Sequence, residues 1–315
     1  MSRILITGGN GFVGNFLVEY LASFGNEISL AVRDDRNNGR ACSSFSVGNI
    51  DGSTNWSQAL ANQDVVIHLA NIAHVPLGEN NGSMNELRKV NVDGSVALAE
   101  AAISCGIKRF IFLSSIKVNG EGTSGVPFCE SDRANPQDLY AESKLEAEQR
   151  LKALCMPSSI ELVILRPPLI YGPNVKGNLE VLKKMVAVGI PLPFLCVSNT
   201  RDMISLKNLS DLIRLCIDHP DAVGQTLLCS DGQPVSTPKL IRYIASAQGR
   251  RVLLFPIPVK VLFFVASLLG REEQFQRLAG DLRIDIASTK KKLNWTPSYA
   301  VDEAMKWAFS DDELF

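Results

Sequence analysis

Short apolar runs alternate with helix-like segments along the first half of the chain. The runs are rich in β-branched and aromatic residues and lie at residues 3–7, 28–32, 65–70, 109–115 and 162–167. Apolar positions with helical spacing fill the segments at 12–24, 84–105 and 138–154. Such alternation predicts an α/β fold with a doubly wound parallel sheet that is covered by helices on both faces.

Beyond about residue 172 the pattern changes into pieces punctuated by proline and glycine, with short helices expected at 205–218 and 236–249. No repeat or low-complexity linker separates the two halves. We therefore expect a larger domain over 1–172. Over 173–315 we expect mainly a smaller C-terminal α/β lobe that is closely packed on the first domain.

The most apolar stretch of the chain is VLLFPIPVKVLFFVASLLG, at residues 252–270. Pro256, Pro258 and Lys260 interrupt it, and the uninterrupted remainder is too short to span a bilayer. We expect a buried helix of the C-terminal lobe here, in preference to a helix on a membrane surface. No transmembrane segment is expected.

Composition narrows the classes of function. The formal net charge of −1 gives no general field that favours nucleic acid or an anionic membrane, although a local cationic site stays open. Seven scattered cysteines, with no CxxC or Cys/His cluster, indicate neither a disulfide framework nor a zinc site. We therefore expect no bound metal. No cationic leader precedes the first strand, so we expect a cytoplasmic protein.

A glycine-rich turn follows the first apolar run at once. In ITGGNGFVG, Gly8 permits a tight turn, Gly11 lets a pyrophosphate approach, and Gly14 lets the next helix pack close to the sheet. Free N–H groups at the start of that helix would face the phosphates. The turn predicts a Rossmann-type dinucleotide-binding domain over 1–172. Its expected cofactor contacts are Gly8, Asn10, Gly11, Phe12, Val13 and Gly14.

The end of the second predicted strand bears on which dinucleotide binds. An acidic residue there would bind the adenosine ribose of NAD, but the sequence has Arg33. Arg33 could pair with a 2′-phosphate, so NADP(H) is favoured over NAD(H). Asp34 or Asp35 could still reach a ribose. Asn49 and Ile50, after the next strand-like run, are expected beside the adenine.

Polar side chains suited to proton transfer stand further along the chain. In YAESK, Tyr140 and Lys144 are four residues apart, hence on one face of a predicted helix. A neighbouring ammonium favours the phenolate form of tyrosine and brings its proton within use. Ser114 and Ser115 end the run 109–115, at the edge where open α/β sheets bind ligands. A serine hydroxyl there could donate to a substrate carbonyl while Tyr140 transfers a proton to it.

These motifs resemble the extended short-chain dehydrogenases/reductases of the UDP-glucose 4-epimerase-like group. The matching segments follow the family order over essentially the whole chain: TGGNGFVG, HLA, FIFLSS, YAESK, RPPLIYGP and RDMISLKNLSD. The resemblance implies a dinucleotide in the N-terminal domain and a nucleotide-sugar, usually UDP-linked, in the C-terminal lobe. It also implies a homodimer through the helices at 84–105 and 138–154.

The resemblance also implies roles for single residues. Ser115 becomes the catalytic hydroxyl, Tyr140 the acid/base, and Lys144 its partner and a ligand of the nicotinamide ribose. Ser114 supports the site from behind. The further implied contacts are Leu69 and Ala70 with the cofactor, and Asn178, Leu179 and Arg201 with the nucleotide diphosphate.

Four further positions carry separate expectations, and one of them leaves an alternative open. For Arg201, a structural salt bridge with Asp202 or Asp211 is the alternative to a diphosphate contact. Asn119 stands where many relatives have a tyrosine, and we expect it to contact the substrate. We expect neither His74 nor Lys117 to be catalytic.

The loops SSIKVNGEG and ANIAHVPLGENN resemble a narrower subgroup, bacterial enzymes of surface-polysaccharide synthesis that reduce the 4-keto group of UDP-2-acetamido-4-keto-6-deoxyhexoses. The first hypothesis is therefore an NAD(P)H-dependent 4-ketoreductase. The second is a UDP-sugar 4-epimerase with tightly held NAD, and the third is a non-catalytic NADP-binding regulator. The intact Ser115, Tyr140 and Lys144 argue against the third.

Overall fold

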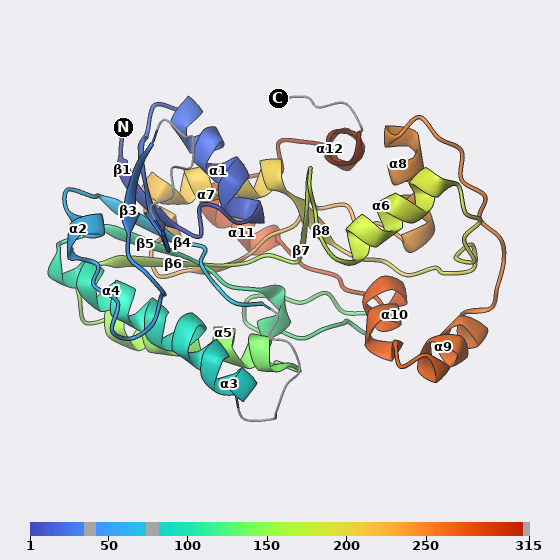
Figure 1. Ribbon diagram of the computed structural model, residues 1–315, viewed down its shortest axis with the longest axis horizontal. Coiled ribbons are helices and arrows are strands. Elements are labelled where there is room, and N and C mark those ends of the chain that lie inside the picture. The colour runs from blue at the N-terminus through green and yellow to red at the C-terminus, as the bar shows by residue number, and fades with distance from the viewer. Residues whose placement is uncertain (35–41, 74–81, 311–315) are drawn as a thin grey trace.

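A seven-stranded parallel sheet is the centre of the computed structural model, which describes residues 1–34, 42–73 and 82–310 (Figure 1). Its strands are β1 (Arg3–Thr7), β2 (Glu27–Val32), β3 (Ser43–Ser46), β4 (Val65–His68), β5 (Arg109–Leu113), β6 (Glu161–Arg166) and β9 (Thr226–Leu228). Their spatial order is β3-β2-β1-β4-β5-β6-β9. The order reverses at β1, and open α/β sheets bind ligands at the strand carboxyl ends beside such a point.

Helices cover both faces of this sheet, as the sequence predicts. One face carries α2 (Ser57–Leu60), α3 (Gly82–Leu87), α4 (Ser95–Ser104) and α5 (Leu139–Cys155), and the other carries α1 (Phe12–Ser23), α7 (Leu206–Asp218) and α11 (Ala287–Leu293). Figure 1 shows α4 and α5 below the sheet and α1 and α7 above it. Because strand side chains alternate, Leu5 of β1 joins the core under α4 and α5, whereas Ile4 and Ile6 join the other.

The smaller lobe lies at the right of Figure 1. It contains the parallel pair β7 (Leu169–Tyr171) and β8 (Met203–Ser205) and the helices α6 (Asn178–Val188), α8 (Thr237–Ala247), α9 (Val259–Leu268), α10 (Glu272–Ala279) and α12 (Val301–Phe309). β9, α7 and α11 follow residue 172 yet belong to the sheet-centred part. The division at residue 172 therefore stays a proposal, since the chain returns to the sheet after it.

The segment predicted as one helix over 84–105 has a wider turn in its middle. A π-helical stretch, Arg88–Gly94, joins α3 to α4, and its Asn91 binds both the N–H and the carbonyl of Ile72. Gly94 lies against Ile50, where an added Cβ would come within 2.6 Å of the Ile50 side chain. Short 3₁₀ turns occupy Ile116–Val118 and Pro220–Ala222.

The expectation of a buried helix at 252–270 is wrong. α9 forms there, but none of its residues is buried, because it packs mainly on α10 at the end of the lobe. Among the described residues no helix combines the length and apolar character needed to cross a membrane.

Candidate active site

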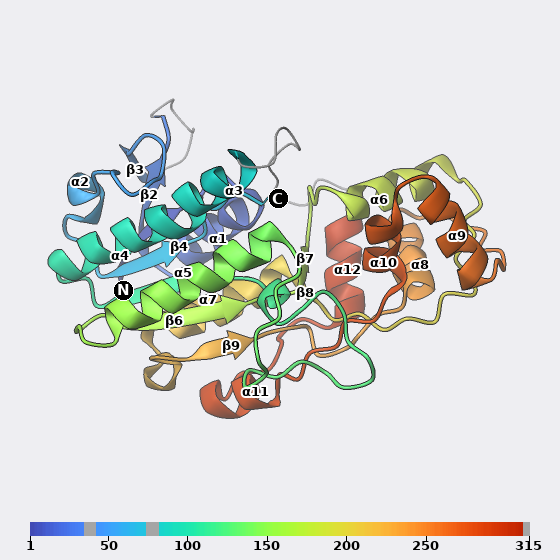
Figure 2. The same ribbon diagram turned by 90° about the horizontal axis from the view of Figure 1, so that it is seen from below.

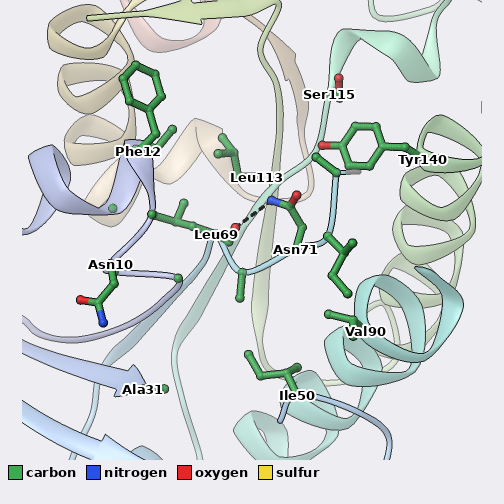
Figure 3. Close-up of a pocket in the computed structure, with 18 of the residues that line it drawn as sticks. Asn10, Phe12, Ala31, Ile50, Leu69, Asn71, Val90, Leu113, Ser115 and Tyr140 are labelled. Carbon is green, nitrogen blue, oxygen red and sulfur yellow. Dashed lines mark hydrogen bonds between the residues drawn. The ribbon is translucent and has the colours of Figure 1, made fainter. Parts of the chain in front are cut away.

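A cavity of about 940 Å³ opens at the carboxyl ends of the central strands (Figure 3). Most of the predicted site residues line it, including the whole glycine turn, Arg33, Ser115 and Tyr140. The full lining is residues 8–14, 31–33, 48–51, 69–73, 86, 89, 90, 113–115, 140 and 167–170. The structure thus gathers the dinucleotide contacts and the two hydroxyls predicted from sequence around one space.

The glycine turn fits a pyrophosphate by close packing. Gly8 has a φ of +71°, and a Cβ on it would stand 2.7 Å from the Ala70 nitrogen. A Cβ on Gly14 would stand 2.3 Å from the Gly8 carbonyl oxygen, so α1 begins tight against the turn. The N-terminus of α1, capped by Gly11, therefore faces the cavity with its free N–H groups. These residues fit a dinucleotide.

The HLA segment is held by a chain of hydrogen bonds. Ala70 N donates to Thr7 Oγ1, which lies 2.6 Å from His68 Nδ1, while His68 Nε2 lies 2.9 Å from Ser95 Oγ. Burial, together with the charge of Lys144, lowers the pKa of His68 to about 3, so the ring is neutral. His68 and Thr7 thereby fix Leu69 and Ala70 at the cavity wall. The sequence did not indicate this role of Thr7, because only the pairing of β1 with β4 brings Thr7 beside His68.

Ser115 begins the turn that follows β5. Its Oγ accepts from the backbone nitrogen of Lys117 at 3.2 Å, so its own proton is free to be donated to a ligand. Figure 3 shows Ser115 and the ring of Tyr140 on one wall of the cavity. Both residues therefore line the same cavity, on the wall that follows β5 and begins α5.

Tyr140 and Lys144 lie one turn apart on α5, which Asp138 caps by accepting from Ala141 N at 2.7 Å. Lys144 is 1% exposed, and its Nζ donates to the Leu113 carbonyl oxygen at 2.9 Å. The same atom is 6.0 Å from the centre of the Tyr140 ring. Lys144 therefore lies behind the cavity wall, beneath the tyrosine.

Burial sets the protonation of this pair. It lowers the pKa of Lys144 to about 7, against the opposing charge of Glu148. It raises the pKa of Tyr140, and the Asp138 carboxylate adds to the rise. This direction is opposite to the fall expected beside an ammonium, because loss of solvation dominates. Tyr140 consequently keeps its proton in this state.

Behind the site, buried polar groups are bonded to one another. Ser114 Oγ donates to Glu148 Oε1 at 2.5 Å, and Arg166 donates to both Glu148 oxygens at 2.9 and 2.6 Å. Arg166 Nη1 also donates to Asn119 Oδ1 at 2.9 Å, and Asn119 Nδ2 donates to the Cys129 carbonyl oxygen. The buried side chain of Asn119 is thus engaged behind the site and does not line the cavity, and its substrate contact stays a prediction.

The other predicted substrate contacts lie outside the large cavity. Leu179 is buried in the core of the smaller lobe, and Asn178 lines a separate apolar groove with α9 and α10. Arg201 donates to the Gly280 carbonyl oxygen at 2.9 Å. Its two suggested salt-bridge partners are engaged elsewhere, Asp202 with Ile284 N and Asp211 with Arg214.

A second arginine lies near Arg201 and was missed from the sequence. Burial lowers the pKa of Arg201, the carboxylates of Glu121 and Asp281 oppose that fall, and the positive charge of Arg277 in α10 adds to it. Arg277 contacts Glu121 at 3.5 Å, and Glu121 also binds Lys117 at 2.7 Å. Lys117 pairs with Asp138, the cap of α5. Sequence spacing gives no signal for Arg277, because folding alone brings α10 beside this turn.

Two predicted positions, Asp35 and His74, lie outside the described residues. No role was predicted for the RPPLIYGP segment, but its residues 167–170 line the same cavity as Ser115.

Comparisons with known proteins agree with this geometry. Residues 4–228 match the NAD dependent epimerase/dehydratase family. A curated relative, UDP-glucose 4-epimerase of Vibrio cholerae, is 44% identical over 306 residues, which cover 96% of this chain and 93% of the relative.

Solved structures share the fold at low identity. UDP-glucose 4-epimerase with UDP-glucose from Thermotoga maritima has a TM-score of 0.75 and 20% identity, covering 98% of this chain and 97% of that one. RMD from Pseudomonas aeruginosa complexed with NADPH has a TM-score of 0.73 and 19% identity, covering 98% of both chains. Because residues 4–228 match the family model and the Vibrio cholerae relative is 44% identical over nearly the whole chain, this chain is a member of the NAD dependent epimerase/dehydratase family.

Proposed function

We propose that the chain transfers hydride at C4 of a UDP-linked sugar, and that its net reaction is the reduction of a 2-acetamido-4-keto-6-deoxyhexose. The observation that carries the proposal is the placement of Ser115 and Tyr140 on one wall of the cavity that the glycine turn also lines. Lys144 lies directly beneath that wall.

The cavity's residues divide between cofactor and substrate. The glycine turn would hold the pyrophosphate of a nicotinamide dinucleotide, and Asn49 and Ile50 would flank its adenine. The expected ribose contact of Lys144 stays a prediction, because its side chain is 1% exposed and lies behind the cavity wall beneath Tyr140. When bound, the dinucleotide supplies or accepts the hydride. Arg33, at the adenosine end of the cavity, favours NADP(H) over NAD(H) because a guanidinium can pair with a 2′-phosphate.

Residues of the chain would bind and protonate the oxygen at C4. The Ser115 hydroxyl donates to it and holds the carbonyl in place, and the Tyr140 hydroxyl gives it a proton as negative charge develops. Because the pKa of Tyr140 is raised, the phenol carries the proton that a reduction requires. Asp138, Glu121 and Lys117 fix the start of α5 and hence the position of Tyr140.

A diphosphate would be bound at the boundary between the two parts. Arg201 donates to the carbonyl of Gly280, which ends α10, and Arg277 lies one turn earlier in the same helix, so both guanidiniums are on the lobe side. Such groups suit planar recognition of phosphate oxygens. We propose this pair, rather than the side chain of Leu179, as the diphosphate ligands. We also propose a homodimer through α4 and α5, which lie side by side on the surface of one sheet face.

The second candidate function is UDP-sugar 4-epimerisation, which the name of the Vibrio cholerae relative favours. The same hydroxyls would serve both reactions, but epimerisation consumes no cofactor. We place reduction first because Arg33, which lines the cavity, favours an exchangeable phosphorylated cofactor.

Absorbance at 340 nm separates the two reactions. The purified chain is mixed with NADPH or NADH and the UDP-linked 4-keto sugar, and we expect one cofactor to be consumed for each sugar reduced. Tyr140→Phe should abolish this consumption. If neither cofactor is consumed while UDP-GlcNAc and UDP-GalNAc interconvert, reduction is refuted and epimerisation is the function.

A further inference from the structure

α9 is apolar around its whole circumference and yet lies on the surface. Lys260 and Ser267 are its only polar residues, and none of its ten residues is buried. Phe264 is 61% exposed, Leu268 is 72% exposed, and Leu269, which follows the helix, is 66% exposed. A helix that is apolar all round is ordinarily enclosed by a protein core or a membrane. The apolar surface of α9 is therefore left uncovered by the described part of this chain.

The exposed apolar surface continues from α9 onto α6. A groove of about 270 Å³ separates the two helices, with Val181 and Met185 of α6 on one side and Val265 and Leu269 on the other. We call these four residues, together with Phe264 and Leu268, the α6–α9 face. A connected apolar surface of this kind marks an interaction site, whereas single exposed apolar residues do not.

Basic residues outnumber acidic ones in the two segments that carry the α6–α9 face. Residues 176–188 hold three lysines and one glutamate, and residues 250–273 hold three arginines, one lysine and two glutamates. Each segment therefore carries a net charge of +2 in a chain whose total is −1. The exposed basic residues Lys184 on α6, Lys260 on α9 and Arg271 in the lining of the groove form what we call the basic rim; Lys184 is paired with Glu180. Two such rims would repel each other across a symmetric interface, whereas anionic headgroups would attract them.

The geometry suits a flat surface at this end of the molecule. Figure 2 places α9 at the end of the smaller lobe, far from α4 and α5. Ten helical residues extend about 15 Å, too short to cross a hydrocarbon core of about 30 Å. Lying in the headgroup plane is the arrangement that buries apolar side chains and keeps the basic rim in contact with anionic lipid.

We propose that the α6–α9 face docks the protein peripherally on an anionic phospholipid bilayer, with Phe264, Leu268 and Leu269 inserted below the headgroups. This goes beyond the proposed function and does not depend on it. It would hold a nucleotide-sugar enzyme at a lipid surface while the dinucleotide cavity stays open to water.

Vesicle flotation tests the proposal with the full chain. Vesicles of mixed phosphatidylglycerol and phosphatidylcholine should carry the protein upward, and added salt or pure phosphatidylcholine should weaken binding. The double variant Phe264→Ser/Leu268→Ser should bind at least about tenfold more weakly, since each change removes a large inserted side chain. Met156→Ser, at an 84% exposed position after α5, is the matched control and should bind like the wild type.

Sedimentation velocity and circular dichroism complete the test. All variants should show wild-type spectra and melting temperatures, because the altered side chains are exposed. The proposal is overturned if the folded wild type stays unbound to anionic vesicles at low salt. It is also overturned if the double variant abolishes a concentration-dependent self-association of the wild type, since the face would then join two copies of the chain.

Discussion

Ser114 and Ser115 are neighbours in the cavity wall with the same side chain, yet their hydroxyls are engaged on opposite sides of it. Ser115 faces the cavity with its proton free for a ligand, while Ser114 is buried and donates to Glu148. The difference extends to what surrounds them: Tyr140 shares the open side, and Arg166 and Asn119 the closed side. We call the cavity side, with Ser115 and Tyr140, the open side, and the buried side behind the wall the closed side. Substitutions on the open side should lower activity, and substitutions on the closed side should lower stability.

The largest effect should come from the open side. Tyr140→Phe removes the transferable proton and should reduce kcat by about 10²- to 10⁴-fold. The free energy of unfolding should change by less than about 0.5 kcal/mol, since no buried bond depends on the hydroxyl. Activity assays beside urea titrations check this. A variant that is active but unstable would assign Tyr140 to the closed side instead.

Glu148→Gln should act on the closed side in the reverse manner. The change leaves Arg166 as a buried, unpaired cation, and we expect a loss of about 3 to 5 kcal/mol in the free energy of unfolding. Glu142→Gln, at an exposed position in the same helix, is the control and should cost less than about 0.5 kcal/mol. Equal urea midpoints for the two variants would contradict a stabilising role for the Glu148–Arg166 pair.

Lys144 lies between the two sides, and it should affect both. Lys144→Met should abolish activity but raise the free energy of unfolding by about 1 to 4 kcal/mol near neutral pH, because a buried charge is removed. The folded protein binds this proton only up to about pH 7, whereas the unfolded chain binds it up to its ordinary pKa of 10.5. Wild-type stability should therefore rise with pH between these values. Urea titrations across this range should show a shallower rise in the variant, and parallel curves would refute the assignment.

The smallest effect should be at the adenosine end of the cavity, away from both serines. Arg33→Ser should raise KM for NADPH by about tenfold and leave KM for NADH nearly unchanged, since only NADPH carries the 2′-phosphate. Steady-state kinetics with both cofactors measures this. A rise for both cofactors alike would mean that Arg33 supports the fold of the cavity rather than selecting the phosphate.

Some features of this protein follow from local sequence alone. The parallel strands and the glycine turn could be predicted because apolar runs, turn residues and helical spacing act over a few residues. Tyr140 and Lys144 share a helix face for the same reason, and Ser115 follows from its position at a strand end. The family resemblance then supplied roles for residues that spacing could not interpret.

Tertiary structure decided the features that depend on distant contacts. Arg166 holds Asn119 behind the site, and the end of α10 contacts Arg201 through the Gly280 carbonyl, which brings Arg277 to the same region. Burial reversed the expected direction of the pKa of Tyr140. The exposure of α9 could not be predicted either, because an apolar helix has the same sequence pattern whether or not other parts of the protein cover it. Solvation and long-range packing depend on the whole fold, and no local pattern of residues determines them.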